Sequence, residues 1–184
     1  MIYPIYVYGS HVLRDETKEI DKDYPEIKKL ASDMFETMYS ANGVGLAAPQ
    51  IGLSIRMFVV DITPYAEDYP EYADFKKVFI NPEIYWESDE EVSMGEGCLS
   101  LPGLNEDVYR PERVRIRWMD EDFNQHDEEF GDYPARVIQH EYDHLEGTVF
   151  TDLINPLRKT LIRNKLSSMG KGKYSAAYKT KHVK

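Results

Sequence analysis

The chain has 184 residues, of which 42% are hydrophobic, and this suits a single domain with a compact core. Cys98 is its only cysteine, which excludes an intramolecular disulfide and fits a reducing compartment. No run approaches the roughly 18 apolar residues of a membrane span, and no basic segment followed by an apolar run opens the sequence. We therefore expect a cytoplasmic protein with no signal peptide and no membrane partner.

The formal net charge of −11 is unevenly distributed along the chain. No acidic residue follows Asp152, whereas nine basic residues do: Arg158, Lys159, Arg163, Lys165, Lys171, Lys173, Lys179, Lys181 and Lys184. A basic arm on an acidic body predicts contact with a polyanion such as RNA. A solubilising, disordered tail is the alternative. We expect no DNA partner.

Residues 24–41 carry apolar side chains at helical spacing and predict an amphipathic helix, with Asp23 capping its start and Asn42 near its end. Residues 43–52 contain three glycines and are expected to form a loop. The β-rich run 56–62 predicts a buried strand. Residues 63–77 are polar and tyrosine-rich, so we expect inert surface there rather than a cover over a binding groove.

Residues 78–86 predict a second strand, broken at Asn81 and Pro82. The alternation of apolar residues and arginines over 113–118 predicts a strand with one buried face, followed by a partner strand at 126–130. Pro134 and Gly147 are expected to lie in the first turn and just past the end of a further helix. A last helix is predicted over 153–168.

These elements predict an α+β fold, with mixed or antiparallel sheets packed around a central helix. We expect residues 1–168 to form one domain that ends in the C-terminal helix. Residues 169–184 are predicted to form a basic, flexible tail.

His140, Glu141 and His144 form a His-Glu-x-x-His motif on that central helix. Residues four apart lie on one helix face, so both imidazoles can reach a single metal ion. Glu141 lies about 100° round the helix, near enough to contact a metal-bound water without being a ligand. The alternative is two surface histidines that share this spacing by chance.

A catalytic site of this kind needs a third protein ligand and an open position. Among the other histidines and Cys98, only Cys98 lies in a supporting motif, the glycine-containing segment 95–103. Glycines let the backbone approach a site closely, and coordination would hold the sulfur as a thiolate. The alternative is that Cys98 is a small buried apolar residue.

Three segments resemble the motifs of the peptide deformylase family: residues 43–50 (GVGLAAPQ), 96–100 (EGCLS) and 139–147 (QHEYDHLEG). Their order and separation also agree, and the similarity extends from about Tyr3 to Ser168. The chain is identified on these residues as a member of the bacterial-type family with a C-terminal helix. The resemblance implies removal of the formyl group from the N-terminal formylmethionine of new polypeptides.

The resemblance also implies roles for individual residues. The family's metal ligands correspond to Cys98, His140 and His144, and its general acid/base corresponds to Glu141. The family prefers Fe²⁺, and Zn²⁺, Ni²⁺ or Co²⁺ can occupy the same site.

Two oxyanion donors fall on the Gln50 side-chain amide and the Leu99 backbone N–H. The resemblance assigns substrate binding to Val44 and Gly45. We expect Gly45 and Gly97 to crowd the site so that only the small formyl group fits.

Two residues near the motif have further expectations. Arg110 occupies the position of the family's partner to Asp143, so we predict an ion pair that fixes the helix. Arg136 stands where some relatives carry an aliphatic residue beside the methionine pocket, so the composition of that pocket stays open.

Two other functions remain open from the residues alone. A metallopeptidase shares the His-Glu-x-x-His motif but would take its third ligand from a downstream residue such as Glu146 or Asp152. A catalytically idle, ribosome-associated metal protein would need four protein ligands, whereas three are found. Because the formylated substrates emerge from the ribosome, the basic C-terminal helix predicts ribosome contact.

Overall fold

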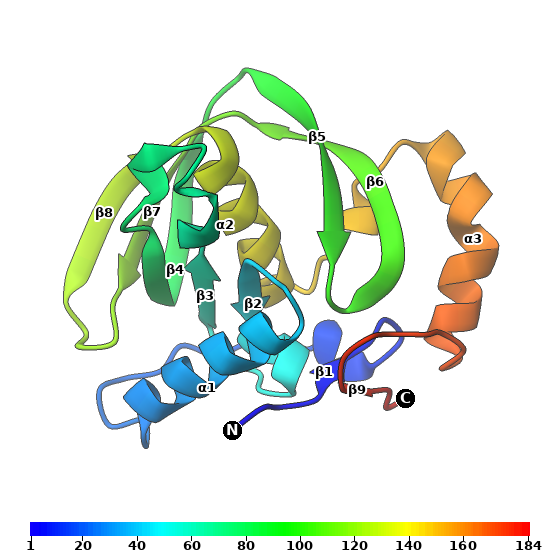
Figure 1. Cartoon of the computed structure of the whole chain (residues 1–184), viewed down its shortest axis with the longest axis horizontal. Coiled ribbons are helices and arrows are strands. Elements are labelled where there is room, and N and C mark those ends of the chain that lie inside the picture. Colours follow the sequence, from blue (N-terminus) through cyan, green and yellow to red (C-terminus); the bar gives the residue numbers. More distant parts are fainter.

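Helix α2 (Asp132–Leu145) lies at the centre of the computed structural model, which describes residues 1–184 (Figure 1). One side of α2 packs on a five-stranded sheet through Val137 and Ile138. Its other side meets a two-stranded hairpin, where the Arg136 guanidinium donates to the Val108 carbonyl at 2.8 Å. The predicted α+β arrangement of sheets around a central helix is confirmed.

The five-stranded sheet is antiparallel throughout and has the order β2–β3–β4–β7–β8. Its strands are Gly45–Ala47 (β2), Met57–Asp61 (β3), Lys76–Glu87 (β4), Val114–Met119 (β7) and Gln125–Phe130 (β8). β3 is buried along its whole length, as predicted for 56–62. In β7 Val114, Ile116 and Trp118 are buried and the arginines are exposed, which confirms the predicted single buried face.

Strand β4 continues through Asn81 and Pro82, so the predicted break is wrong. A register shift between Ile80 and Glu83 accommodates the proline, which lacks an N–H for the ladder. Asn81 adopts a positive φ of 49°, and its side chain exchanges two hydrogen bonds with the Ile20 backbone at 2.9 and 2.7 Å. The irregularity is therefore a bulge that ties the N-terminal segment to the sheet.

The hairpin of β5 (Glu91–Cys98) and β6 (Leu101–Pro111) is not apparent from the sequence. β5 contains two glycines and few apolar residues, and two of the inward positions of β6 are the charged Glu106 and Arg110. Charges at buried positions hide the alternation that identifies a strand with one buried face. The turn of this hairpin carries Cys98 to the edge of α2.

The predicted N-terminal helix is confirmed as α1 (Ile27–Ser40), which packs beneath β2 and β3. Asp23 does not cap it, because the helix begins four residues later and its N-cap is Glu26. The backbone N–H of Asp23 instead donates to Asp21 in a turn. The glycine-containing segment expected as a loop forms β2 and a buried 3₁₀ helix, Ala48–Ile51.

Helix α2 begins and ends where Pro134 and Gly147 predicted. Pro134 lies in its first turn, where its missing N–H costs no helical hydrogen bond. Gly147 follows the last turn with φ +70°, and the Thr148 N–H returns to the Asp143 carbonyl at 2.9 Å.

Residues 63–77 are not inert surface. They form two short 3₁₀ helices, Thr63–Tyr65 and Pro70–Tyr72, and Tyr72 and Phe75 are buried in the core around the sheet. The expectation failed because polar neighbours obscured these aromatic anchors.

The C-terminal helix α3 (Pro156–Gly170) begins three residues later than predicted, with the Asn155 side chain accepting from the Leu157 N–H at 2.8 Å. The segment after it does not behave as the predicted flexible tail. It returns beneath the hairpin, and β9 (Thr180–Lys181) pairs in parallel with β1 (Ile5–Tyr6) (Figure 1). None of the helices has both the length and the apolar character needed to cross a bilayer.

Candidate metal centre

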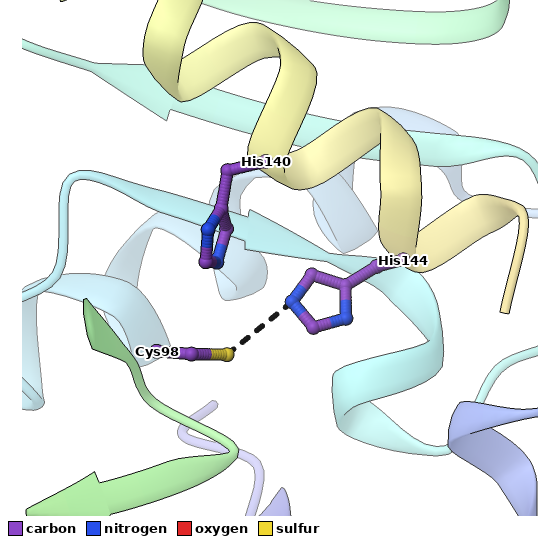
Figure 2. A group of neighbouring side chains, drawn as sticks. All are labelled: Cys98, His140 and His144. Carbon is purple, nitrogen blue, oxygen red and sulfur yellow. Dashed lines mark hydrogen bonds between the residues drawn. The ribbon is translucent and has the colours of Figure 1, made fainter. Parts of the chain in front are cut away.

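Cys98, His140 and His144 converge at the junction of the hairpin and α2 (Figure 2). One ligand atom from each lies within 4.8 Å of the others, and Cys98 Sγ is 3.3 Å from His144 Nε2. The two imidazoles come from successive turns of α2, whereas Cys98 is the last residue of β5. One sulfur and two imidazole nitrogens suit a borderline-soft divalent cation, and three ligands leave a position open.

A buried carboxylate orients His140. Glu96 Oε1 lies 2.8 Å from His140 Nδ1, so that nitrogen carries the proton and Nε2 is left for a metal. The same carboxylate accepts two hydrogen bonds from Arg110, at 2.7 and 3.0 Å, and one from Arg136, at 2.7 Å. These contacts fix the tautomer and the ring plane of His140 before any ion binds.

Arg110 also donates to Asp143 at 2.7 Å, which confirms the predicted pair between the hairpin and α2. Its guanidinium thus bridges Glu96 and Asp143, and the Arg110 side chain is only 5% exposed. Burial alone would raise the pKa of Glu96, but hydrogen bonds from His140 and Arg110 hold that pKa well below its ordinary value of 4.5. Glu96 is therefore a permanent anion at neutral pH.

Glu141 stands on the same turn as His140 but has a different environment. It is 4% exposed, and its Oε2 has no hydrogen-bond partner. Burial raises its pKa to about 7, which suits a group that takes and returns a proton near neutral pH. An added Cβ at Gly45 would lie 2.6 Å from Glu141 Oε1, so only glycine leaves room for the carboxylate.

Gln50 has its amide fixed in the orientation of a donor. Its Oε1 accepts from the Ala47 N–H at 2.9 Å, which turns Nε2 toward Ser100 Oγ at 3.1 Å and Cys98 Sγ at 3.6 Å. Leu99 follows Cys98 in the hairpin turn, and its N–H makes no hydrogen bond within the protein. Both predicted donors therefore stand beside the three candidate ligands.

A cavity of about 550 Å³ opens over these residues, and its lining includes Val44, Gly45 and Gly97. At Gly97 an added Cβ would meet the Asn105 side chain at 2.7 Å across the hairpin. Gly97 therefore has a structural reason to be glycine that is separate from crowding near a metal.

Four further parts of the cavity wall lie outside the motifs, and of these only Arg136 was expected near the pocket. Tyr65 and Tyr133 line it as an edge-to-face pair with ring centroids 5.6 Å apart. Arg136 also lines it, and both terminal nitrogens of its guanidinium are hydrogen-bonded, to Glu96 and to the carbonyls of Val108 and Val92. The fourth part is the segment 175–178, from the end of the chain. None of these residues lies in a motif, and only the fold brings them together.

Comparisons with known proteins agree with the geometry. A family model described as polypeptide deformylase matches residues 2–160. A peptide deformylase of Flavobacterium johnsoniae is 50% identical, with 98% of this chain and 96% of the relative covered. One from Christiangramia forsetii is 48% identical, with coverage of 97% and 95%.

Solved structures are similar in fold as well as sequence. The peptide deformylase of Thermus thermophilus superposes with a TM-score of 0.81 at 42% identity, covering 94% of this chain and 100% of that one. Peptide deformylase 1B of Arabidopsis thaliana, solved with an inhibitor, gives a TM-score of 0.82 at 35% identity, with coverage of 92% and 91%.

Replacing Glu96 by glutamine tests the buried carboxylate. Glu96→Gln leaves the buried Arg136 guanidinium without a carboxylate partner and Arg110 with Asp143 alone, and we expect it to lower the free energy of unfolding by about 3 kcal/mol at pH 7. Because the folded-state pKa of Glu96 is depressed, this contribution is full above its ordinary pKa of 4.5 and shrinks as pH falls below it. Denaturant unfolding at pH 7 and pH 4 measures both effects.

The matched control is Glu106→Gln. Glu106 on β6 lies opposite Glu96 in the strand register of the hairpin. Its carboxylate accepts two hydrogen bonds from Arg158, whose side chain is 51% exposed. Although the Glu106 side chain is buried, the guanidinium that its replacement leaves behind is half-exposed, so the loss should be smaller than for Glu96, about 1 kcal/mol. Equal losses for the two variants would contradict a special role for Glu96.

Proposed function

The chain belongs to the polypeptide deformylase family, and from that premise we propose that the cavity beside α2 is its active site. The enzyme is a metal-dependent hydrolase that removes the formyl group from the N-terminus of new polypeptides. Cys98, His140 and His144 are the proposed metal ligands. The observation that supports this most directly is the approach of their three ligand atoms to within 4.8 Å from two distant segments.

A divalent cation held there would supply a Lewis acid that polarises the formyl carbonyl and lowers the pKa of water. Glu141 accepts the proton of the attacking water and delivers it to the amine nitrogen as the C–N bond breaks. Formate and a free methionine amine are the products. The Gln50 amide and the Leu99 N–H stabilise the charge that develops on the formyl oxygen.

Val44, Gly45 and Gly97 are proposed to hold the backbone of the formylated peptide. All three line the cavity, and Gly45 stands beside the proton-transfer group. Crowding around Glu141 favours the small formyl group over an acetyl group.

The two alternative functions have less support. The acids that a metallopeptidase would use are engaged elsewhere, Asp152 by Arg14 at 2.6 Å and Glu146 by Arg56 at 3.3 Å. A purely structural metal would have four protein ligands, whereas the cluster has three. The buried Glu141, which has no structural hydrogen bond at Oε2, also favours catalysis.

Fe²⁺ is the proposed native cation, with Zn²⁺, Ni²⁺ or Co²⁺ as alternatives that the same donors accommodate. Anaerobic purification with elemental analysis, followed by hydrolysis of formyl-Met-Ala-Ser, tests both metal and activity. Activity should fall on exposure to air if iron and the Cys98 thiolate are involved. Stable activity in air together with bound zinc would overturn the iron proposal.

Two variants separate binding of the metal from proton transfer. Glu141→Gln should keep the metal and lose at least about a hundredfold in kcat, because it cannot accept a proton. Cys98→Ala should lose both metal and activity. Acetyl-Met-Ala-Ser serves as the control substrate. A Cys98→Ala enzyme that retained metal and activity would refute the proposed ligand set.

Gly45→Ala tests the contact between β2 and the catalytic carboxylate. The added methyl group must displace Glu141, and we expect a loss on the order of a hundredfold in kcat with metal content unchanged. Gly95→Ala is the control, because its added Cβ would meet only Asp107 at 3.6 Å. Similar rates for the two alanine variants would contradict the steric argument.

We also propose that α3 contacts the ribosome, where formylated chains emerge in the cytoplasm. Lys159, Arg163 and Lys165 are exposed on this helix, whereas Arg158 is paired with Glu106. The double variant Arg163→Glu/Lys165→Glu should bind ribosomes more weakly and with a shallower salt dependence. Cosedimentation measures this against Lys18→Glu/Lys22→Glu, and equal binding of the two would refute the proposal.

A further inference from the structure

The last residues of the chain are held against the body of the protein by backbone pairing. Thr180 and Lys181 pair with β1, and the Val183 N–H donates to Ser10 Oγ at 3.1 Å. The His182 ring lies 3.0 Å from the Gly170 carbonyl, at the end of α3. The path between α3 and β9 is therefore fixed at both ends.

Between these anchors, residues 175–178 line the cavity over the candidate metal centre. Ser175 and Ala177 are exposed, so they stand at its open rim, whereas Tyr178 is half-buried. The Tyr178 hydroxyl donates a 2.6 Å hydrogen bond to the Leu99 carbonyl. The Tyr178 ring packs with Leu99 against the core beneath β2.

The contact with Leu99 bears on the chemistry because of its place in the hairpin turn. Leu99 directly follows Cys98, and its free N–H is the proposed donor to the formyl oxygen. The Leu99 side chain also approaches Gly43, where an added Cβ would lie 2.7 Å from Leu99 Cδ1. The Leu99 turn is thus held by two contacts: its carbonyl accepts the Tyr178 hydrogen bond, and its side chain packs closely against Gly43.

We propose that residues 175–178 form one wall of the peptide-binding groove, and that Tyr178 is a positioning residue for the Leu99 turn. This inference rests on the proposed function. The formyl group enters the buried end of the cavity at Glu141, so the peptide beyond methionine must leave by the open rim. Ser175 and Ala177 stand at that rim and contact the residues that follow the methionine.

The positioning role is tested with Tyr178→Phe, which removes one hydroxyl and keeps the ring. In the metal-loaded enzyme we expect kcat for formyl-Met-Ala-Ser to fall about three- to tenfold, the effect of one hydrogen bond, with little change in KM. Amide hydrogen exchange of residues 98–101 should become faster, and this readout does not depend on turnover.

Tyr174→Phe is the matched control for the hydroxyl. Tyr174 lies directly before residues 175–178, but its hydroxyl bonds Thr180 Oγ1 at 2.9 Å and the residue does not line the cavity. It should leave kcat and the exchange of residues 98–101 within about twofold of wild type. Equal effects of the two phenylalanine variants would overturn the role of Tyr178.

The wall is tested with Ala177→Trp, which places a large side chain at the rim. We expect the ratio of kcat/KM for formyl-Met-Ala-Ser to that for formyl-Met to change by about fivefold or more. Lys173→Trp, exposed and outside the cavity lining, should leave the ratio unchanged. An unchanged ratio in Ala177→Trp would overturn the wall proposal.

The outcome is separable from the proposed function. If the wild-type enzyme turns over formyl-Met-Ala-Ser, the proposed function is supported whatever the variants show. Wild type without such turnover refutes the function, and the inference that rests on it.

Discussion

The buried carboxylate of Glu96 holds the two halves of the site together. It lies on β5 and is bonded to Arg110 on β6 and to Arg136 and His140 on α2. Cys98 lies two residues beyond Glu96, past a register shift in the hairpin between Gly97 and Cys98, so anchoring Glu96 to α2 also keeps Cys98 close to α2. Glu96 bonds His140 at 2.8 Å, and Cys98 Sγ lies 3.3 Å from His144 Nε2, one helical turn further along.

The charged side chains around α2 fall into two groups: those paired with an opposite charge, and Glu141, which has no such partner. The carboxylates of Glu96 and Asp143 are matched by the guanidinium groups of Arg110 and Arg136, all on or facing α2. That buried set is neutral as a whole, which offsets the cost of taking each charge out of water. Glu141 is left outside the set without a cationic side-chain partner, and burial raises its pKa to about 7. Glu96, held by hydrogen bonds, and Glu141, the proposed proton-transfer group, thus differ in environment although both lie next to His140.

Close backbone approach gives the site its remaining shape. The absence of a side chain at Gly45 lets β2 pass beside Glu141, and at Gly97 it makes room for Asn105 within the hairpin. The Gln50 amide is oriented by the backbone N–H of Ala47, the last residue of β2, so its donor faces Cys98 without help from a ligand. The end of the chain then closes the outer side of the Leu99 turn. The proposed donors are oriented by contacts within the protein, which would reduce the reorganisation needed during reaction.

Local rules explain which parts of the molecule could be predicted from the sequence. Helix α1, the buried strand β3 and the alternating β7 follow from periodicity, and Pro134 and Gly147 bound α2 through their backbone preferences. Periodicity did not predict β5 and β6, because buried charged residues obscure the alternation in these strands. The predicted cap at Asp23 was wrong, because the N-cap of α1 is Glu26. Polar surroundings likewise hid the buried anchors Tyr72 and Phe75.

The sequence by itself indicated the candidate site, because His140 and His144 lie four residues apart on one helix face, Glu141 directly follows the first of them, and Cys98 is the only thiol. Their ordered motifs were enough to indicate the family. Only the tertiary structure decided how Cys98 reaches the histidines, where the Arg136 guanidinium turns, and that residues 175–178 line the cavity. Those features depend on contacts between residues far apart in the chain, which local spacing does not encode.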